Sequence, residues 1–456
     1  MSAVRNEGSH RTNSPALSRR ALLRWAGWAG VSLALSACSA WQPFANRRAR
    51  QKAQLVYQDW RTEWFPPMAQ QMLEKFHATH PSIRVFYTPD PANLEEQMLA
   101  DMQAGTAADV FQGCCAHFPI WAQKGYCLDL RSYVTADLDK ATIADWDPVQ
   151  YRYFLTQDGR QYALPKYHGA LALYYNKDAF DAGKVGYPDG SWSYDDYAQA
   201  MKRLSRDTDG DGKVDQWGSM IDVSWERIQV HVNAWGGHFV DPDDPARCMM
   251  GEPEALEAVS WIRSRVWQDG TMATPHSAQS SGTSEAFASG KLAMVEDGSW
   301  ALKYILTEAS FRIGVAPMPK GPVRRATLAT TDGFAIYSGT QYPEAAWELI
   351  KFLVSADYGR AMAQTHFLQP ARASLLDEWA GFVRADYPEK AREMDINAFA
   401  DGHLNGYSVT AEVFANMNEA RRIANDAWDR VLTLGDAPLN EIEAACQRIG
   451  EAQKGG

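Results

Sequence analysis

The chain has 456 residues, of which 46% are hydrophobic and 22% charged, values typical of a folded protein with room for two domains. Its net charge is −11, from 45 Lys and Arg against 56 Asp and Glu. Residues 1–52 hold nine of the basic side chains and one acid, which leaves 36 basic and 55 acidic side chains, or −19. Such an acidic body repels phosphate backbones, so nucleic-acid binding is disfavoured.

Residues 1–38 have the layout of an export signal. Arg19 and Arg20 stand directly before a short apolar stretch at 25–37 that is rich in Ala, Gly and Ser. The arginine pair is similar to a twin-arginine signal, and Leu-Ser-Ala-Cys at 35–38 is similar to a lipobox, which predicts lipidation of Cys38. The alternative is an uncleaved N-terminal anchor. Both interpretations tether the body outside the cytoplasmic membrane through a linker at 39–52.

The cysteines after Cys38 give weak signals for metal or redox motifs, because no pair has zinc-finger or CxxC spacing. They are Cys114, Cys115, Cys127, Cys248 and Cys446. An oxidising compartment allows a disulfide, for which Cys127 with Cys114 or Cys115 is the nearest pair in sequence. We prefer the alternative in which adjacent Cys114 and Cys115 are buried small residues.

The first third of the chain alternates strands and helices. Strands are expected at 54–60, 82–88 and 108–111, with amphipathic helices between them that end at His80-Pro81 and at Gly105. This order predicts a parallel sheet covered by helices. Parallel sheets bind ligands beyond the carboxyl ends of their strands, so Trp60 and Gln112 are candidate ligand-binding residues.

Two later passages are more distinctive. Residues 162–177 form a β-rich run that is broken by polar and small residues. Residues 287–300 predict a helix closed by Gly290, a buried strand at 292–295, a turn at Asp297-Gly298 and a helix that begins near Ser299. Further motifs follow at 314–319, 331–336, 343–354 and 368–372.

These motifs resemble the family 1 extracellular solute-binding proteins over roughly residues 55–373. The resemblance implies an α/β, two-lobed periplasmic-binding-protein-like fold, with mostly parallel sheets, helices on both faces and a hinge of about three crossings. The first lobe would comprise 53–166 and 328–368, and the second lobe 167–327 and 369–456. The crossings would lie near 166–170, 326–328 and 367–372.

The resemblance also implies a function. The chain would be the substrate-binding lipoprotein of an ABC importer, acting as a monomer without enzymatic activity. It would bind a mono- or oligosaccharide, close on it and deliver it to the membrane permease.

A sugar-binding cleft mixes indole faces with polar side chains, because a pyranose has apolar C–H faces and a rim of hydroxyls. The resemblance favours Trp300 and Trp235, the latter beside Gly236, and then Trp60 and Tyr167. Polar candidates near predicted strand ends or crossings are Gln112, His168, Asp297, Asp332 and Arg372. The alternative is that the rings fill the core and the polar residues are turns or caps. His168 has no visible nucleophile beside it, so it is interpreted as a hydrogen-bonding residue.

An acidic loop has the spacing of a calcium site. Its oxygen donors would be the carboxylates of Asp207, Asp209, Asp211 and Asp215 and the carbonyl of Lys213. Gly218 occupies the twelfth position, where an EF-hand has Glu, so a complete EF-hand is excluded. The sequence predicts a structural Ca²⁺, and the alternative is a solvated acidic turn.

Rival functions lack their sequence marks. The chain has no HExxH, GxSxG or P-loop motif and no GxGxxG after a strand, so an exported glycoside hydrolase or oxidoreductase gains no support. We expect no redox cofactor. An adhesion or scaffold protein would show repeats or low-complexity stretches, which are missing.

Overall fold

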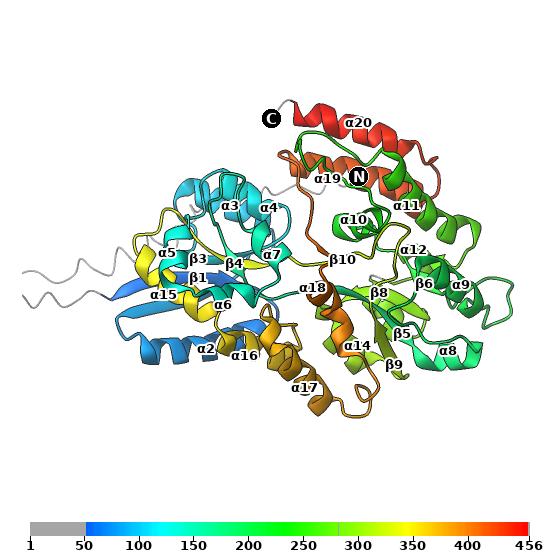
Figure 1. Cartoon of the computed structure of the whole chain (residues 1–456), viewed down its shortest axis with the longest axis horizontal. Coiled ribbons are helices and arrows are strands. Elements are labelled where there is room, and N and C mark those ends of the chain that lie inside the picture. Colours follow the sequence, from blue (N-terminus) through cyan, green and yellow to red (C-terminus); the bar gives the residue numbers. More distant parts are fainter. Residues whose placement is uncertain (1–51, 281, 455–456) are drawn as a thin grey trace, which may run out of the picture.

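The computed structural model describes residues 52–280 and 282–454. The predicted export signal, Cys38 and all of the linker before Lys52 lie outside the described residues. The described chain folds into two lobes that lie side by side and are joined by extended crossings (Figure 1). This confirms the predicted two-lobed α/β architecture.

The first lobe is built on a five-stranded sheet in the described chain, with the order β2-β1-β3-β11-β4. These strands are β1 (Ala53–Asp59), β2 (Ile83–Pro89), β3 (Val110–Gly113), β4 (Leu164–Pro165) and β11 (Gly333–Ile336). Strand β1 pairs in parallel with β2 and β3, as the alternation predicted. Strand β11, which enters this sheet from the second lobe, runs antiparallel to β3 and β4.

Helices cover this sheet on both faces (Figure 1). They are α2 (Phe65–Thr79), α3 (Leu94–Ala104), α4 (His117–Gln123), α5 (Arg131–Asp137), α6 (Lys140–Ala144), α7 (Pro148–Tyr153), α15 (Pro343–Leu353) and α16 (Ala356–His366). Helix α2 shows why they form: prolines occupy its first turn, where no intrahelical N–H bond is lost, and Met68, Met72 and Phe76 bury one stripe. That stripe packs into the same core as Leu55 and Tyr57 of β1.

The second lobe contains a sheet of order β8-β5-β9, in which both pairs are antiparallel. Its strands are β5 (Leu171–Asn176), β8 (Met294–Gly298) and β9 (Ile313–Ala316). Two separate parallel pairs accompany it, β6 (Ser219–Met220) with β7 (Met272–Ala273) and β10 (Thr327–Leu328) with β12 (Ser408–Val409). The expectation of mostly parallel sheets therefore holds only for β1, β2 and β3 of the first lobe and for the two short pairs of the second lobe. Strand β8 also runs through Asp297 and Gly298, where a turn was predicted, because both residues pair with β5.

The helices of the second lobe surround these strands. They are α8 (Lys177–Gly183), α9 (Tyr194–Leu204), α10 (Trp225–Ala234), α11 (Pro253–Arg263), α12 (Pro275–Ala278), α13 (Thr283–Ala288), α14 (Leu302–Glu308), α17 (Leu376–Asp386), α18 (Asp401–Asn405), α19 (Met417–Trp428) and α20 (Glu441–Gln453). Short 3₁₀ segments occur at η2 (Ser299–Ala301), η3 (Ala373–Leu375) and η4 (Ile396–Phe399), and π segments extend α11 at η1 (Ser264–Gln268) and α19 at η5 (Asp429–Thr433).

A disulfide joins Cys446 of α20 to Cys248, with a Cα–Cα distance of 5.6 Å. The suggested pairing of Cys127 with Cys114 or Cys115 is wrong, because the Cys127 thiol is free and buried within the first lobe. Cys114 and Cys115 are half-buried rather than fully buried. The true pair is 198 residues apart in sequence, and only the fold brings it together.

The chain crosses between the lobes after β4, between β10 and β11, and after α16. The crossing segments pair with one another, through antiparallel bridges of Tyr167 with Pro370 and of Ala170 with Ala329. The lobe boundaries drawn from the sequence stay a prediction.

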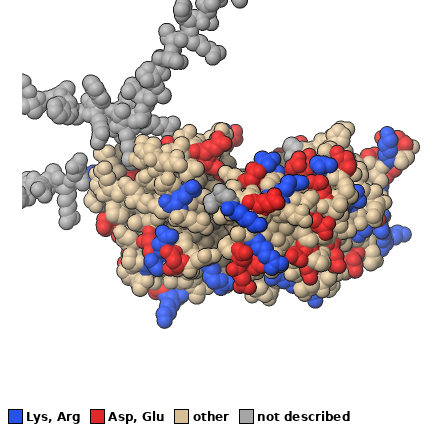
Figure 2. Space-filling model, turned by 90° about the horizontal axis from the view of Figure 1, so that it is seen from above, with Lys and Arg blue, Asp and Glu red and all other residues tan. Residues whose placement is uncertain are grey.

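In residues 52–280 and 282–454, no helix is long and apolar enough to cross a membrane. On the face shown in Figure 2, acidic and basic side chains are interspersed over the second lobe instead of gathering in patches of one sign.

Candidate functional site

A cavity of about 370 Å³ lies between the lobes, within the size range of small-molecule sites. We call it the interlobe cavity. It is lined by Trp60, Cys114, Cys115, Tyr167, Ser224, Glu226, Arg227, Trp300, Leu328, Ala329, Thr330, Thr331, Asp332 and Ala411. Both lobes and two of the crossings contribute to this wall, so a change in the angle between the lobes would change the cavity.

Trp60 lines the cavity from the first lobe, directly after β1. The fully buried Nζ of Lys166 lies 3.1 Å from the centroid of its ring and covers one face by a cation–π contact. The ring of Tyr167 packs edge-on against Trp60 at 5.4 Å. The indole is therefore held rigidly at the carboxyl end of β1, where the sequence placed a candidate ligand contact.

Trp300 faces the cavity from the second lobe, in η2. Its ring packs against three separate hydrophobic clusters, two of the second lobe and one of the first. Gly169 and Gly298 make room for it, since a Cβ atom on either would lie 2.9 Å or less from the ring. The close approach at Gly298 explains why the motif at 287–300 ends in Gly-x-Trp.

Asp332 lines the cavity immediately before β11. It is 7% exposed, and burial raises the pKa of its carboxyl to about 7. Nearby, Asp59 forms an ion pair with Lys166, and burial raises the pKa of Asp59 and lowers that of Lys166. Burial and the charge of Asp59 raise the pKa of Asp90 to about 6. One lysine thus balances three carboxyls beneath this wall.

The first turn of α10 adds Glu226 and Arg227, which the sequence reasoning missed. The Arg227 guanidinium forms ion pairs with Asp297 at 2.6 Å and Asp222 at 3.0 Å, and lies 5.9 Å from the centroid of the Trp300 ring. Glu226 is paired with Arg421 at 2.5 Å. A second cavity of about 550 Å³ begins here, since Ser224 and Glu226 line both cavities.

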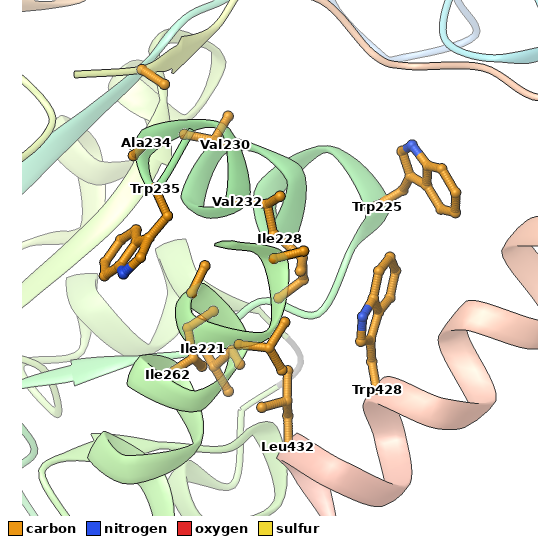
Figure 3. Close-up of a cluster of buried hydrophobic side chains, with 14 of the residues drawn as sticks. Ile221, Trp225, Ile228, Val230, Val232, Ala234, Trp235, Ile262, Trp428 and Leu432 are labelled. Atoms are coloured by element: carbon orange, nitrogen blue, oxygen red, sulfur yellow. The ribbon is translucent and has the colours of Figure 1, made fainter. Parts of the chain in front are cut away.

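Trp235 and Gly236 lie outside the interlobe cavity. Trp235 is 7% exposed at the end of α10, and its ring contacts Tyr194 and Trp261 in the core of the second lobe. Figure 3 shows it at the opposite end of α10 from Trp225. Gly236 has a φ of +88° and packs against Val323. The sequence could not separate Trp235 from Trp300, because both indoles lie within two residues of a glycine.

Gln112 and Asp297 lie behind the cavity wall and hold its residues. The buried amide of Gln112 donates to Asp90 Oδ2 at 2.7 Å. Asp297 is 1% exposed and accepts bonds from Thr283 and Ser284 at 2.8 and 2.6 Å in addition to the Arg227 pair. Burial by itself would raise the pKa of Asp297, but the charge of Arg227 and the hydrogen bond from Ser284 outweigh it and lower the pKa, so the carboxylate stays charged.

His168 and Arg372 also lie away from the cavity lining, near the crossings. His168 is fully buried, with its Nε2 2.9 Å from Asp147 and its Nδ1 3.2 Å from Gln369. The Arg372 guanidinium donates to the carbonyl of Val354. These partners give both residues a structural role at the hinge region.

The acidic loop is exposed, and side-chain oxygens of Asp207, Asp209 and Asp215 lie within 4.8 Å of one another. Asp211 and Lys213 share the turn but stand outside that group. Both carboxylate oxygens of Asp207 accept backbone N–H bonds, from Gly210 and Gly212. The donor set is one that Ca²⁺ accepts, and calcium binding stays a prediction.

The fold is shared with solved solute-binding proteins. An ABC substrate-binding protein of Listeria monocytogenes in complex with cycloalternan is 21% identical, with a TM-score of 0.75, covering 88% of this chain and 99% of that one. UgpB of Mycobacterium tuberculosis in complex with glycerophosphocholine is 19% identical, with a TM-score of 0.70, covering 88% and 98%. The sugar-binding protein MalE of Xanthomonas citri is 18% identical, with a TM-score of 0.72 and the same coverage.

Sequence comparison agrees. A protein of Brucella abortus (strain 2308) that carries the name of a binding protein is 25% identical over 313 residues, or 67% of this chain and 72% of that one. The family profile of the bacterial extracellular solute-binding proteins matches residues 61–360. The chain therefore belongs to the bacterial extracellular solute-binding protein family.

Proposed function

We propose that the chain binds a carbohydrate in the interlobe cavity and delivers it unaltered to an ABC permease. The observation that carries this proposal is the pair of indoles, Trp60 and Trp300, presented to one cavity from opposite lobes. Each can stack on a sugar C–H face, while Asp332, Arg227 and the Thr330 and Thr331 hydroxyls supply hydrogen-bonding groups for sugar hydroxyls.

The charges favour a neutral sugar over a phosphorylated ligand. Arg227 is the basic residue of the described cavity lining, and two carboxylates already neutralise it. Glu226 and Asp332 add acidic groups to the same wall. A phosphate group placed here would meet net negative charge. The adjoining cavity offers space for a ligand longer than one sugar unit.

Binding would favour the closed arrangement of the lobes, because only that arrangement lets one ligand contact both indoles. The closed form would then dock on the permease. We further propose that the chain is exported by a twin-arginine signal and anchored through lipidated Cys38, a proposal that rests on the sequence of residues 1–38. We also propose that it acts as a monomer.

The test is calorimetric titration of the purified chain with neutral oligosaccharides, amino sugars and glycerophosphodiesters, with each mixture then assayed by chromatography for turnover. We expect one neutral sugar to bind and to be recovered intact. Binding of phosphodiesters alone, or consumption of the sugar, would refute the proposal. Small-angle scattering should show a smaller radius of gyration when ligand is bound.

The variant Trp300→Ala should weaken binding by about 1–3 kcal/mol, which is roughly 5- to 150-fold in Kd. Trp267→Ala is the matched control, since this indole is 46% exposed and lies outside the cavity lining. Equal affinities for the two variants would show that the Trp300 ring does not contact the ligand.

A further inference from the structure

Two adjacent cysteines in the wall of the interlobe cavity are placed to react with each other. Cys114 and Cys115 lie in the turn between β3 and α4, and both line the cavity. The Cys115 thiol donates a hydrogen bond to Cys114 Sγ, with the two sulfurs 2.8 Å apart. To form a disulfide from this arrangement, the pair must lose two protons and two electrons, and the sulfurs must approach each other slightly.

The backbone of this turn is held in an unusual conformation. Cys115 has a φ of +56°, in the left-handed region that residues other than glycine rarely adopt. Such a conformation persists where surrounding contacts impose it. Here the Cys115 N–H donates to Thr331 Oγ1 at 3.0 Å, and its carbonyl accepts from the Tyr153 hydroxyl at 3.1 Å. The turn therefore keeps both sulfurs on the cavity side.

We propose that Cys114 and Cys115 form a disulfide with each other, and that this disulfide is reduced more easily than the one between Cys248 and Cys446. Adjacent Cα atoms are only about 3.8 Å apart, closer than the usual spacing across a disulfide, so the bond closes a tight ring. Strained and accessible disulfides are the readily reduced ones. The Cys248 and Cys446 Cα atoms, at 5.6 Å, have ordinary spacing.

The oxidant is another disulfide, of a small molecule or a thiol-oxidising protein, as extracytoplasmic compartments supply. Cys115 can make the first attack, and the step balances equally with the two cysteines exchanged. The Cys115 thiolate bonds to one sulfur of the oxidant and expels the other as a thiol. The Cys114 thiolate then attacks Cys115 Sγ and expels the second thiol. The pair loses two electrons and two protons, and the oxidant gains them.

The cavity wall would differ between the two states. The reduced pair presents an S–H donor, whereas the oxidised pair presents a rigid, apolar S–S face. Ligand affinity should therefore depend on the oxidation state, a consequence that rests on the proposed function. The bond itself can be tested without any ligand, so its failure is distinguishable from failure of sugar binding.

The test treats the purified chain with glutathione disulfide or with graded dithiothreitol, alkylates free thiols after denaturation, and maps the peptides by mass spectrometry. We expect the oxidised peptide with Cys114 and Cys115 to carry no alkyl group and to lack two hydrogen atoms. Cys127 should be alkylated throughout, and dithiothreitol should open the adjacent pair before Cys248–Cys446.

Alkylation of both adjacent cysteines after oxidation, a bridge from either to Cys127, or simultaneous opening of both disulfides would overturn the proposal. Cys114→Ser should leave Cys115 as a mixed disulfide with glutathione, whereas Cys127→Ser, the matched control, should leave ring formation unchanged. The wild-type peptide map is independent of whether either variant folds.

Discussion

Replacing Asp332 by Asn should make the chain more stable at high pH and change little at low pH. The folded-state pKa of Asp332 is about 7, against an ordinary value of 3.8. Between these values the folded state holds a proton that the unfolded state has lost, so stability falls as pH rises through this window. At about 1.4 kcal/mol per pH unit, the full difference is about 4 kcal/mol, present below pH 4 and lost above pH 7.

The assay is urea unfolding of the wild type and Asp332→Asn at closely spaced pH values from 5 to 8. Over this range the wild type should lose about 2.5 kcal/mol more than the variant. Titration of Asp90 affects both proteins and cancels in the comparison. Asp357→Asn is the matched control, because this side chain is 78% exposed. Parallel pH profiles for wild type and Asp332→Asn would refute the assignment of the raised pKa to this burial.

Three further predictions concern the second lobe. Trp235→Ala should cost about 3–5 kcal/mol of unfolding free energy, because a buried indole is lost from the core. Ligand affinity measured by calorimetry should stay unchanged. A loss of affinity like that of Trp300→Ala would contradict the placement of Trp235 outside the cavity. Cys248→Ser should cost about 5 kcal/mol, from the 198-residue separation of the bridge, and an unchanged urea midpoint would refute this. Added Ca²⁺ should raise the Tm of the wild type but not that of the double variant Asp207→Asn, Asp209→Asn, and equal shifts would exclude the loop as its site.

The parts of the fold that follow from local pattern could be predicted. Alternating strands and helices in the first third specify parallel pairing, because each strand must return to the same edge of the sheet. The strand-end rule then locates Trp60, and the family resemblance of residues 287–300 favours Trp300. These signals are contained in a few consecutive residues.

The remainder depends on contacts between residues far apart in sequence. Arg227 is held at the cavity by its ion pair with Asp297 of β8, which lies 70 residues later in the sequence, and no local pattern reports that contact. Trp235 and Trp300 each lie within two residues of a glycine, but the partners of Trp235, such as Tyr194 and Trp261, are tens of residues away. Proximity in sequence likewise suggested the wrong partner for Cys127.

The bond between Cys248 and Cys446 closes a covalent loop that passes through both lobes. Strand β11 and helices α15 and α16 belong to the first lobe, yet they lie between these cysteines in sequence. A protease that cuts once within the loop, for example beside Val323, which is 63% exposed, leaves two peptides that remain linked. Such nicked molecules would migrate as one band in a denaturing gel without reductant, and would separate only after reduction.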